Sequence, residues 1–408
     1  MKTFLIGKSL IHTFSPYLHS LMGNGDYGIK ELREEELGAF FAERDFDGIN
    51  VTVPYKEKVL EYVDVLSEEA KAVGAVNTVV NRNGVLYGYN TDVFGFEMLL
   101  LRFFGGEIPR GIRVAVLGTG GAAKSAVYVL KKYTDSVLTV SRTPGDGEIS
   151  YAEIPHDTEL IVNCTPVGMY PDTDGLPVAP DRFGELLGVI DVVYNPIRPR
   201  LVTEAEKMGI KACGGLYMLV CQGVKANRLF GGKEADCGAV YREIMKKQNI
   251  VLIGMPSCGK TTVGRLLAEM TGRELYDSDI IIENEEKMRI SEIFAKKGEG
   301  YFRGLESEVI ARLSEKADGK IIATGGGAVL DGKNTGRLRS NGTVIFIDRP
   351  LGELTLDGNR PLMKTAGDIE RLYAGRLPIY CKAADFAVDG SGSAEEVAER
   401  ILCLLKNR

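Results

Sequence analysis

Residues 254–261 follow the pattern Gly-x-x-x-x-Gly-Lys-Thr, whose residue types suit the binding of phosphate groups. A short apolar run at residues 250–253 precedes the pattern, and apolar residues at helical spacing follow it from Val263. The alternative is a glycine-rich turn with a surface lysine. Because strand, loop and helix agree, the pattern predicts a P-loop whose lysine reaches phosphate oxygens and whose threonine hydroxyl suits Mg²⁺. The expected nucleotide contacts are Ser257, Cys258, Gly259, Lys260, Thr261 and Thr262.

A second glycine pattern, Gly-x-Gly-x-x-Ala at residues 118–123, lies between an expected strand at 113–117 and an expected helix to about residue 133. With a second strand at 137–140 this is a βαβ unit, the context that binds dinucleotides. An NAD site would place an acidic residue after the second strand, but Ser141, Arg142 and Thr143 stand there. A cation and two hydroxyls favour the 2′-phosphate of NADP, and the alternative is an exposed arginine in a turn. The expected turn residues are Gly118, Thr119, Gly120, Gly121 and Ala122.

Ser15 is expected to cap a helix that begins at Pro16, with the Thr13 hydroxyl nearby. Three polar clusters stand at expected strand ends, at residues 50–57, 75–78 and 88–92. Lys56 follows a strand that Pro54 is expected to end. Each cluster alone has an ordinary explanation as a cap, a turn or a solvated charge. Together they suggest a polyhydroxy ligand, and a pair of Lys56 with Asp92 could supply and orient the proton that carbonyl reduction requires.

The second half carries further candidates, each with an ordinary alternative. Asp279 could N-cap a helix, and Arg303 could be a solvated charge at a helix start. Glycines 325–327 follow a buried strand, where three glycines suggest close backbone approach to a ligand. Arginines in one pocket suit a carboxylate substrate.

Composition limits the classes of protein that fit. At 408 residues the chain has room for two or three domains, and its net charge of −6 disfavours nucleic acid or an anionic membrane as partner. We find no signal peptide pattern and no apolar run of membrane-spanning length. The 7 cysteines form no Cys-x-x-Cys and the 3 histidines have no metal-ligand spacing, which fits a cytoplasmic protein.

Residues 1 to about 247 resemble shikimate dehydrogenases in eight motifs, at residues 13–16, 50–56, 74–78, 90–92, 118–122, 163–169, 191–196 and 215–222. The resemblance implies that Lys56 with Asp92 handles the proton at the reacting oxygen. It also implies that Ser141, Arg142 and Thr143 bind NADP, with Gly215 on the cofactor side. The implied shikimate contacts are Thr13, Ser15, Thr52, Asn77, Asp92, Tyr194 and Gln222.

Residues from about 249 to 408 resemble shikimate kinases in the P-loop, Asp277-x-Asp279, Arg303-x-x-Glu306, glycines 325–327, residues 360–362 and Arg376-x-Pro-x-Tyr380. The resemblance implies that Arg360 closes over the phosphates of ATP and that Asp277 helps Thr261 place Mg²⁺. Asp279 would orient or deprotonate the attacking hydroxyl, with Lys260 beside the phosphates. The implied shikimate contacts are Asp279, Arg303, Gly326 and Arg376.

We therefore expect an α/β protein: an open α/β substrate domain and a Rossmann NADP domain, followed by a P-loop kinase domain with a parallel sheet. The expected boundaries are 1–105 with 215–247, then 106–214, then 248–408. The expected function is NADPH-dependent reduction of 3-dehydroshikimate and phosphorylation of shikimate by ATP. Two alternatives remain: a quinate-preferring dehydrogenase fused to another small-molecule kinase, and a non-catalytic sensor.

Overall fold

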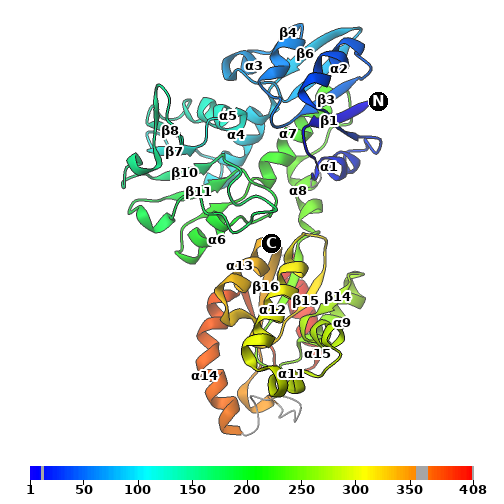
Figure 1. Ribbon diagram of the computed structural model, residues 1–408, viewed down its shortest axis with the longest axis vertical. Helices are drawn as coiled ribbons and strands as arrows, with labels where there is room; N and C mark the ends of the chain where they lie inside the picture. The colour runs from blue at the N-terminus through cyan, green and yellow to red at the C-terminus, as the bar shows by residue number, and fades with distance from the viewer. Residues whose placement is uncertain (11–12, 355–365, 407–408) are drawn as a thin grey trace. The chain divides into compact units, whose positions relative to one another are not determined.

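In a computed structural model, which describes residues 1–10, 13–354 and 366–406, the chain divides into two compact units (Figure 1). The first unit is Met1–Met245 and the second is Lys246–Arg408. The first contains two six-stranded sheets and the second contains one five-stranded sheet. Each unit has its own buried apolar clusters.

The first sheet of the first unit is mixed. Strands β1, β2 and β3 pair in parallel, whereas β5 pairs antiparallel with both β3 and β6. Asn83 and Gly84 connect β5 to β6, and both have positive φ, as the two-residue turn of a tight hairpin requires. In sheet order the strands are β2 (Gly28–Glu31), β1 (Thr3–Gly7), β3 (Gly48–Val51), β5 (Thr78–Arg82), β6 (Val85–Tyr89) and β4 (Val65–Leu66).

The second sheet is wholly parallel, and its strand order has the reversal between β10 and β7 that defines a Rossmann fold. Strand β7 is buried along its whole length, as expected where helices cover both faces of a parallel sheet. In sheet order the strands are β12 (Ala212–Cys213), β11 (Gly188–Asp191), β10 (Leu160–Asn163), β7 (Val114–Leu117), β8 (Val137–Val140) and β9 (Glu148–Ile149).

Helices α4 and α7 pack against each other and lie between the two sheets (Figure 1). Their contact brings residues from distant parts of the chain together, because α4 precedes the Rossmann strands and α7 follows them. The helices of this unit are α1 (Ser15–Leu21), α2 (Leu37–Glu43), α3 (Glu68–Val73), α4 (Thr91–Phe104), α5 (Gly121–Leu130), α6 (Arg200–Lys207), α7 (Leu216–Leu229) and α8 (Cys237–Met245).

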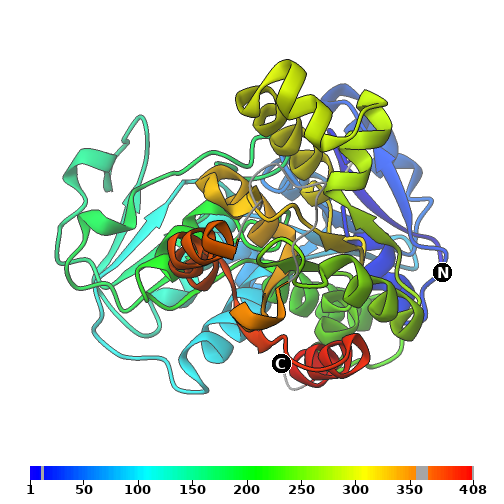
Figure 2. The ribbon, with the colours of Figure 1, turned by 90° about the horizontal axis from the view of Figure 1, so that it is seen from below.

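The second unit is built on a parallel sheet with β13 at its centre. In sheet order the strands are β14 (Leu275–Asp277), β15 (Ile321–Ala323), β13 (Asn249–Ile253), β16 (Gly342–Asp348) and β17 (Phe386–Asp389). Helix α15 lies beside α9 in both views (Figures 1 and 2). The helices are α9 (Lys260–Thr271), α10 (Ser278–Glu286), α11 (Ile290–Lys297), α12 (Glu299–Ser314), α13 (Gly332–Asn341), α14 (Ala366–Ala383) and α15 (Ala394–Lys406).

The structure confirms the expected fold class and changes several local details. Ser15 is the first residue of α1 and not its cap, because Phe14 occupies the cap position without a side-chain bond. Strand β3 ends at Val51, so Val53 is 72% exposed. Arg303 lies inside α12, which begins at Glu299. Across the described residues, no helix combines the length and apolarity needed to span a membrane.

Candidate active sites

A lysine and an aspartate form a close ion pair in the first unit. Lys56 follows β3, and its Nζ lies 2.7 Å from Oδ2 of Asp92, whose side chain is 7% exposed. Asp92 is the second residue of α4, where the helix dipole stabilises a negative charge. The pair therefore holds an ammonium group, a proton donor, at a fixed position beside a carboxylate.

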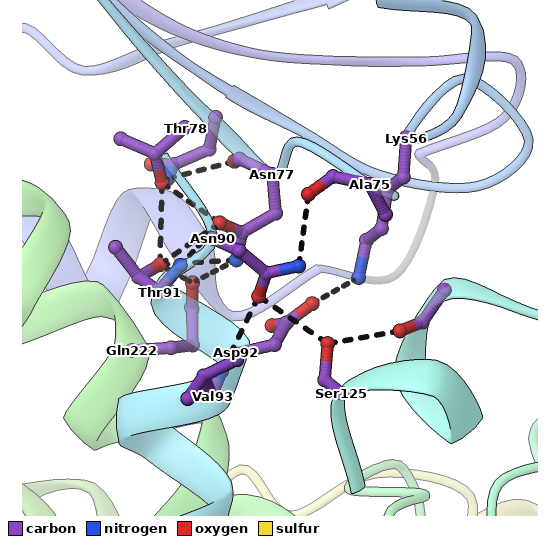
Figure 3. A network of polar contacts seen from close by, with 12 residues as sticks. Lys56, Ala75, Asn77, Thr78, Asn90, Thr91, Asp92, Val93, Ser125 and Gln222 are labelled. Atoms are coloured by element: carbon purple, nitrogen blue, oxygen red, sulfur yellow. Dashed lines mark hydrogen bonds and ion pairs between the residues drawn. The ribbon is translucent and has the colours of Figure 1, made fainter. Parts of the chain in front are cut away.

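A buried amide network lies next to this pair (Figure 3). Asn77 accepts the backbone N–H of Thr91 at 2.7 Å, which fixes which end of its amide is the oxygen. Its Nδ2 then donates to the Thr91 hydroxyl at 3.0 Å and to Oε1 of Gln222 at 3.5 Å. Gln222 is oriented in turn by donating to the carbonyl of Leu219. The structure thus brings together Lys56, Asn77, Asp92 and Gln222 from four separate segments of the unit.

Thr13, Ser15 and Tyr194 form a second group of contacts. The Thr13 hydroxyl lies 3.0 Å from the Ser15 hydroxyl, and Tyr194 shares a side-chain hydrogen bond with Thr13. Burial raises the pKa of Tyr194, so its hydroxyl keeps its proton. Thr52 follows β3 and lies close to Gly7. A Cβ added to Gly7 would fall only 2.8 Å from the Thr52 methyl group.

The glycine-rich turn expected to bind the dinucleotide lies directly against Lys56. Gly118 has a φ of +108°, which only glycine adopts readily, and Gly120 precedes the first turn of α5. A Cβ on Gly120 would meet open space, whereas one on Gly121 would lie 3.2 Å from Cδ of Lys56. The helix N-terminus is therefore open to a phosphate, with Thr119 and Ala122 on either side of the two glycines.

The residues expected to read the 2′-phosphate form a compact turn after β8. The hydroxyl of Ser141 accepts from the backbone N–H of Thr143 at 3.3 Å. Arg142 between them is exposed, which leaves its guanidinium accessible to a ligand. Gly215 caps α7, and a Cβ there would fall 2.0 Å from the carbonyl oxygen of Val192.

In the second unit the P-loop lysine is buried, which contradicts the alternative of a surface lysine. Lys260 is 8% exposed, and its Nζ donates to the carbonyls of Gly254 at 3.0 Å and Met255 at 2.9 Å. Gly259 and Ser257 both have positive φ, which curls the loop before α9. Cys258 is buried beneath the loop, with its sulfur 3.7 Å from Nζ of Lys260, while Thr262 lies in the first turn of α9.

Two oxygen donors that suit Mg²⁺ lie side by side. The Thr261 hydroxyl donates to Oδ2 of Asp277 at 2.5 Å. Asp277 is also the N-cap of α10, so the cap alternative considered for Asp279 falls on Asp277 instead. Because Mg²⁺ usually takes only one or two protein oxygens beside phosphate and water, this pair fits the ion.

The remaining kinase candidates converge around glycines 325–327. A Cβ on Gly325 would lie 2.5 Å from Oδ1 of Asp279, and one on Gly327 would lie 2.3 Å from the guanidinium of Arg303. The carbonyl of Gly326 accepts from Arg376 at 3.1 Å. The structure thus brings together one carboxylate and two arginines. Arg360 lies outside the described residues.

Three buried polar side chains received no role from sequence reasoning. Glu306 is 1% exposed and accepts from Arg303 at 2.7 Å, and burial raises its pKa against the opposing effect of that arginine. Asp191 is fully buried at the end of β11, where burial raises its pKa to about 7. Ser125 in α5 is also fully buried and donates to Asn90. In the sequence, the signal for Asp191 was a charged residue within an otherwise apolar expected strand.

The fold and the two sites define a class: a Rossmann-type dehydrogenase joined to a P-loop kinase. The shikimate dehydrogenase (NADP⁺) of Clostridium beijerinckii is 38% identical over 252 residues, which are 57% of this chain and 92% of that protein. The chain therefore belongs to the shikimate dehydrogenase family.

Family models match both units. Residues 5–79 match the shikimate dehydrogenase substrate binding domain, and residues 256–406 match shikimate kinase. The chain is thus a bifunctional enzyme of the shikimate pathway, with dehydrogenase and kinase activities.

Solved structures resemble the first unit. The shikimate 5-dehydrogenase of Thermus thermophilus, in complex with NADP(H) and shikimate, is 32% identical with a TM-score of 0.53 and covers 59% of this chain and 98% of its own. The quinate dehydrogenase of Corynebacterium glutamicum, in complex with NAD, is 26% identical with a TM-score of 0.51 and covers 59% and 96%.

Proposed function

We propose that the first unit reduces 3-dehydroshikimate to shikimate with NADPH, and that the second unit transfers a phosphoryl group from ATP to the 3-hydroxyl of shikimate. The observation that carries this proposal is the contact between the Lys56–Asp92 pair and the dinucleotide turn, in a chain that also contains a P-loop. The product of the first reaction is the substrate of the second.

In the reduction, bound NADPH supplies the hydride. Lys56 donates a proton to the oxygen that becomes the hydroxyl, and Asp92 holds the ammonium group in place. Asn77 and Gln222, which belong to the same amide network, bind ring hydroxyls of the substrate. The rest of the substrate is bound by Tyr194, Thr13, Ser15 and Thr52. The exposed Arg142 would pair with the 2′-phosphate of NADPH, and the hydroxyls of Ser141 and Thr143 would bind the same group.

In the phosphoryl transfer, bound ATP and Mg²⁺ supply the phosphoryl group and charge neutralisation. Lys260, which donates to two backbone carbonyls, would donate to phosphate oxygens, and Thr261 with Asp277 would hold the ion. Asp279 orients the attacking hydroxyl, and Arg303, Arg376 and the Gly326 backbone bind the shikimate carboxylate.

A second candidate is a dehydrogenase that prefers quinate and NAD. The similarity to a quinate dehydrogenase solved with NAD favours testing it. Arg142 supports NADP instead, because an arginine at this position suits a phosphate and NAD has none there.

The same proposal includes the domain organisation and the setting. Residues 1–105 with 215–247 bind the substrate and 106–214 bind NADP, and the division of the chain at Met245 supports a kinase domain over 248–408. Free cysteines fit the cytoplasm, and the partners are small molecules, not nucleic acid or membrane.

One reaction mixture tests both halves. Purified protein is mixed with 3-dehydroshikimate, NADPH, ATP and Mg²⁺, and NADPH oxidation and shikimate 3-phosphate are followed together. Parallel mixtures replace NADPH by NADH, or run the oxidation from shikimate or quinate. We expect shikimate 3-phosphate to form at the expense of NADPH. A preference for quinate with NAD would overturn the dehydrogenase half, and shikimate that accumulates unphosphorylated would overturn the kinase half.

A further inference from the structure

The side chain of Asn90 joins three segments of the first unit (Figure 3). Its Oδ1 accepts the backbone N–H of Val93, which caps α4, and also lies 3.3 Å from the hydroxyl of Ser125 in α5. Its Nδ2 donates at 2.9 Å to the carbonyl of Ala75. Asn90 is 6% exposed and Ser125 is fully buried, so these contacts are shielded from water.

Each of the three segments carries part of the dehydrogenase site. Helix α4 begins with Thr91 and Asp92, and the Ala75 segment continues to Asn77. Helix α5 begins at Gly121, at the dinucleotide turn, and a Cβ at that residue would fall 3.2 Å from Cδ of Lys56. A shift of α5 relative to α4 would therefore move the cofactor turn against the catalytic lysine.

Given the proposed dehydrogenase function, we propose that Asn90 and Ser125 are positioning residues that couple the NADP-binding helix α5 to the Lys56–Asp92 pair and to Asn77. NADP binding at the N-terminus of α5 holds that helix in one place. Because Ser125 and Asn90 link α5 to α4 and to the Ala75 segment, a fixed α5 also fixes the groups that bind and protonate the substrate. By linkage, the cofactor and shikimate must then strengthen each other's binding.

Asn90 and Ser125 should contribute unequally to this coupling. The Ser125 hydroxyl has one proton, and it lies closer to the Gly121 carbonyl, at 2.9 Å, than to Asn90. Asn90 accepts from Val93 and donates to Ala75, in addition to sharing the proton of Ser125. Loss of the Asn90 amide should therefore have the larger effect, and loss of Ser125 should have no additional effect once the amide is gone.

The test uses Asn90→Ser in the full chain, because serine caps a helix as well as asparagine does but is too short to reach Ala75 and Ser125. We expect kcat for reduction to fall about tenfold with little change in kinase activity. Shikimate binding is then titrated calorimetrically with and without NADPH, because two reduced ligands cannot react with each other. We expect NADPH to tighten shikimate binding about fivefold or more in the wild type and less than twofold in the variant.

Ser125→Ala should lower kcat about threefold, and the double variant should match Asn90→Ser. The matched control is Ser67→Asn, which exchanges the same two residue types at the N-cap of α3 and should leave kcat and the binding ratio within twofold. The proposal is overturned if NADPH leaves the affinity of the wild type for shikimate unchanged, or if Asn90→Ser changes neither kcat nor the binding ratio. An inactive wild type would instead refute the proposed function, and the inference with it.

Discussion

The two lysines that we propose to be catalytic are held in opposite ways. In the first unit, Lys56 is paired with a carboxylate, Asp92, at 2.7 Å. In the second, Lys260 donates to the carbonyls of Gly254 and Met255, which carry no charge. A lysine that handles a proton benefits from a charged partner that fixes its position, whereas a lysine that binds phosphate must keep its charge for the ligand.

The polar groups in the two sites also differ in how their hydrogen-bond partners hold them. Asn77 and Gln222 are locked by hydrogen bonds to each other and to the backbone, so the first site is preorganised. Around glycines 325–327, Arg303 pairs with the buried Glu306 and Arg376 donates to a carbonyl. We infer that the first site gains most from fixed geometry and the second from charge that a ligand can recruit.

Among substitutions that test this difference between the two sites, we expect the largest loss of activity at Asp279. Asp279→Asn removes the charge that we propose orients the attacking hydroxyl but leaves the P-loop intact. We expect shikimate phosphorylation to fall about 10³-fold with ATP affinity unchanged, measured by coupled assay and by nucleotide titration. Asp331→Asn at the N-cap of α13 is the control, since asparagine caps equally well. Loss of ATP binding in the Asp279 variant would mean that this aspartate is structural.

The second effect concerns acid stability of the first unit. His19 is 1% exposed and stacks on Tyr27, and burial lowers its pKa from 6.5 to about 4. Since the folded state holds the neutral ring, its contribution is complete above pH 6.5 and is lost as the pH falls towards 4. We expect this group to cost up to about 3 kcal/mol of stability over that range.

Urea unfolding of the first unit at pH 7 and pH 4 measures that cost. His19→Gln should flatten the dependence on pH, whereas His156→Gln, at an exposed site, should leave it as in the wild type. If the unfolding free energy of the His19 variant depends on pH as in the wild type, other buried groups cause the acid sensitivity.

A smaller effect is expected at the cofactor site. Arg142→Asp replaces a phosphate partner with a repelling charge on an exposed turn. The ratio of kcat/KM for NADPH to that for NADH should fall about tenfold. Arg110→Asp, an exposed arginine before β7, is the control. If the ratio stays constant, Arg142 is an ordinary surface residue.

Sequence patterns predicted the local elements better than the contacts between them. The strand expected at residues 137–140 is β8 as observed, and the P-loop lies between β13 and α9. Periodicity detects such elements because it reports burial within one segment. The cap assigned to Ser15 was wrong, because a local preference for serine at N-caps cannot show where the first hydrogen-bonded turn begins.

Contacts across the fold had no local signal. Asn77 and Gln222 are 145 positions apart, and only the resemblance to a family placed them in one site. Arg303 and Glu306 show the spacing of an ordinary surface pair on a helix, yet Glu306 is buried. The link from Ser125 to Asn90 depends on how α5 packs beside α4, which residue types alone do not specify.

The most direct test of the central claim is to measure both activities on one preparation of Lys56→Ala. If Lys56 serves proton transfer in the first unit alone, reduction of 3-dehydroshikimate should fall about 10²- to 10⁴-fold. Phosphorylation of added shikimate should stay within twofold of the wild type. A reduction rate within twofold of the wild type, or a parallel loss of both activities, would contradict the account.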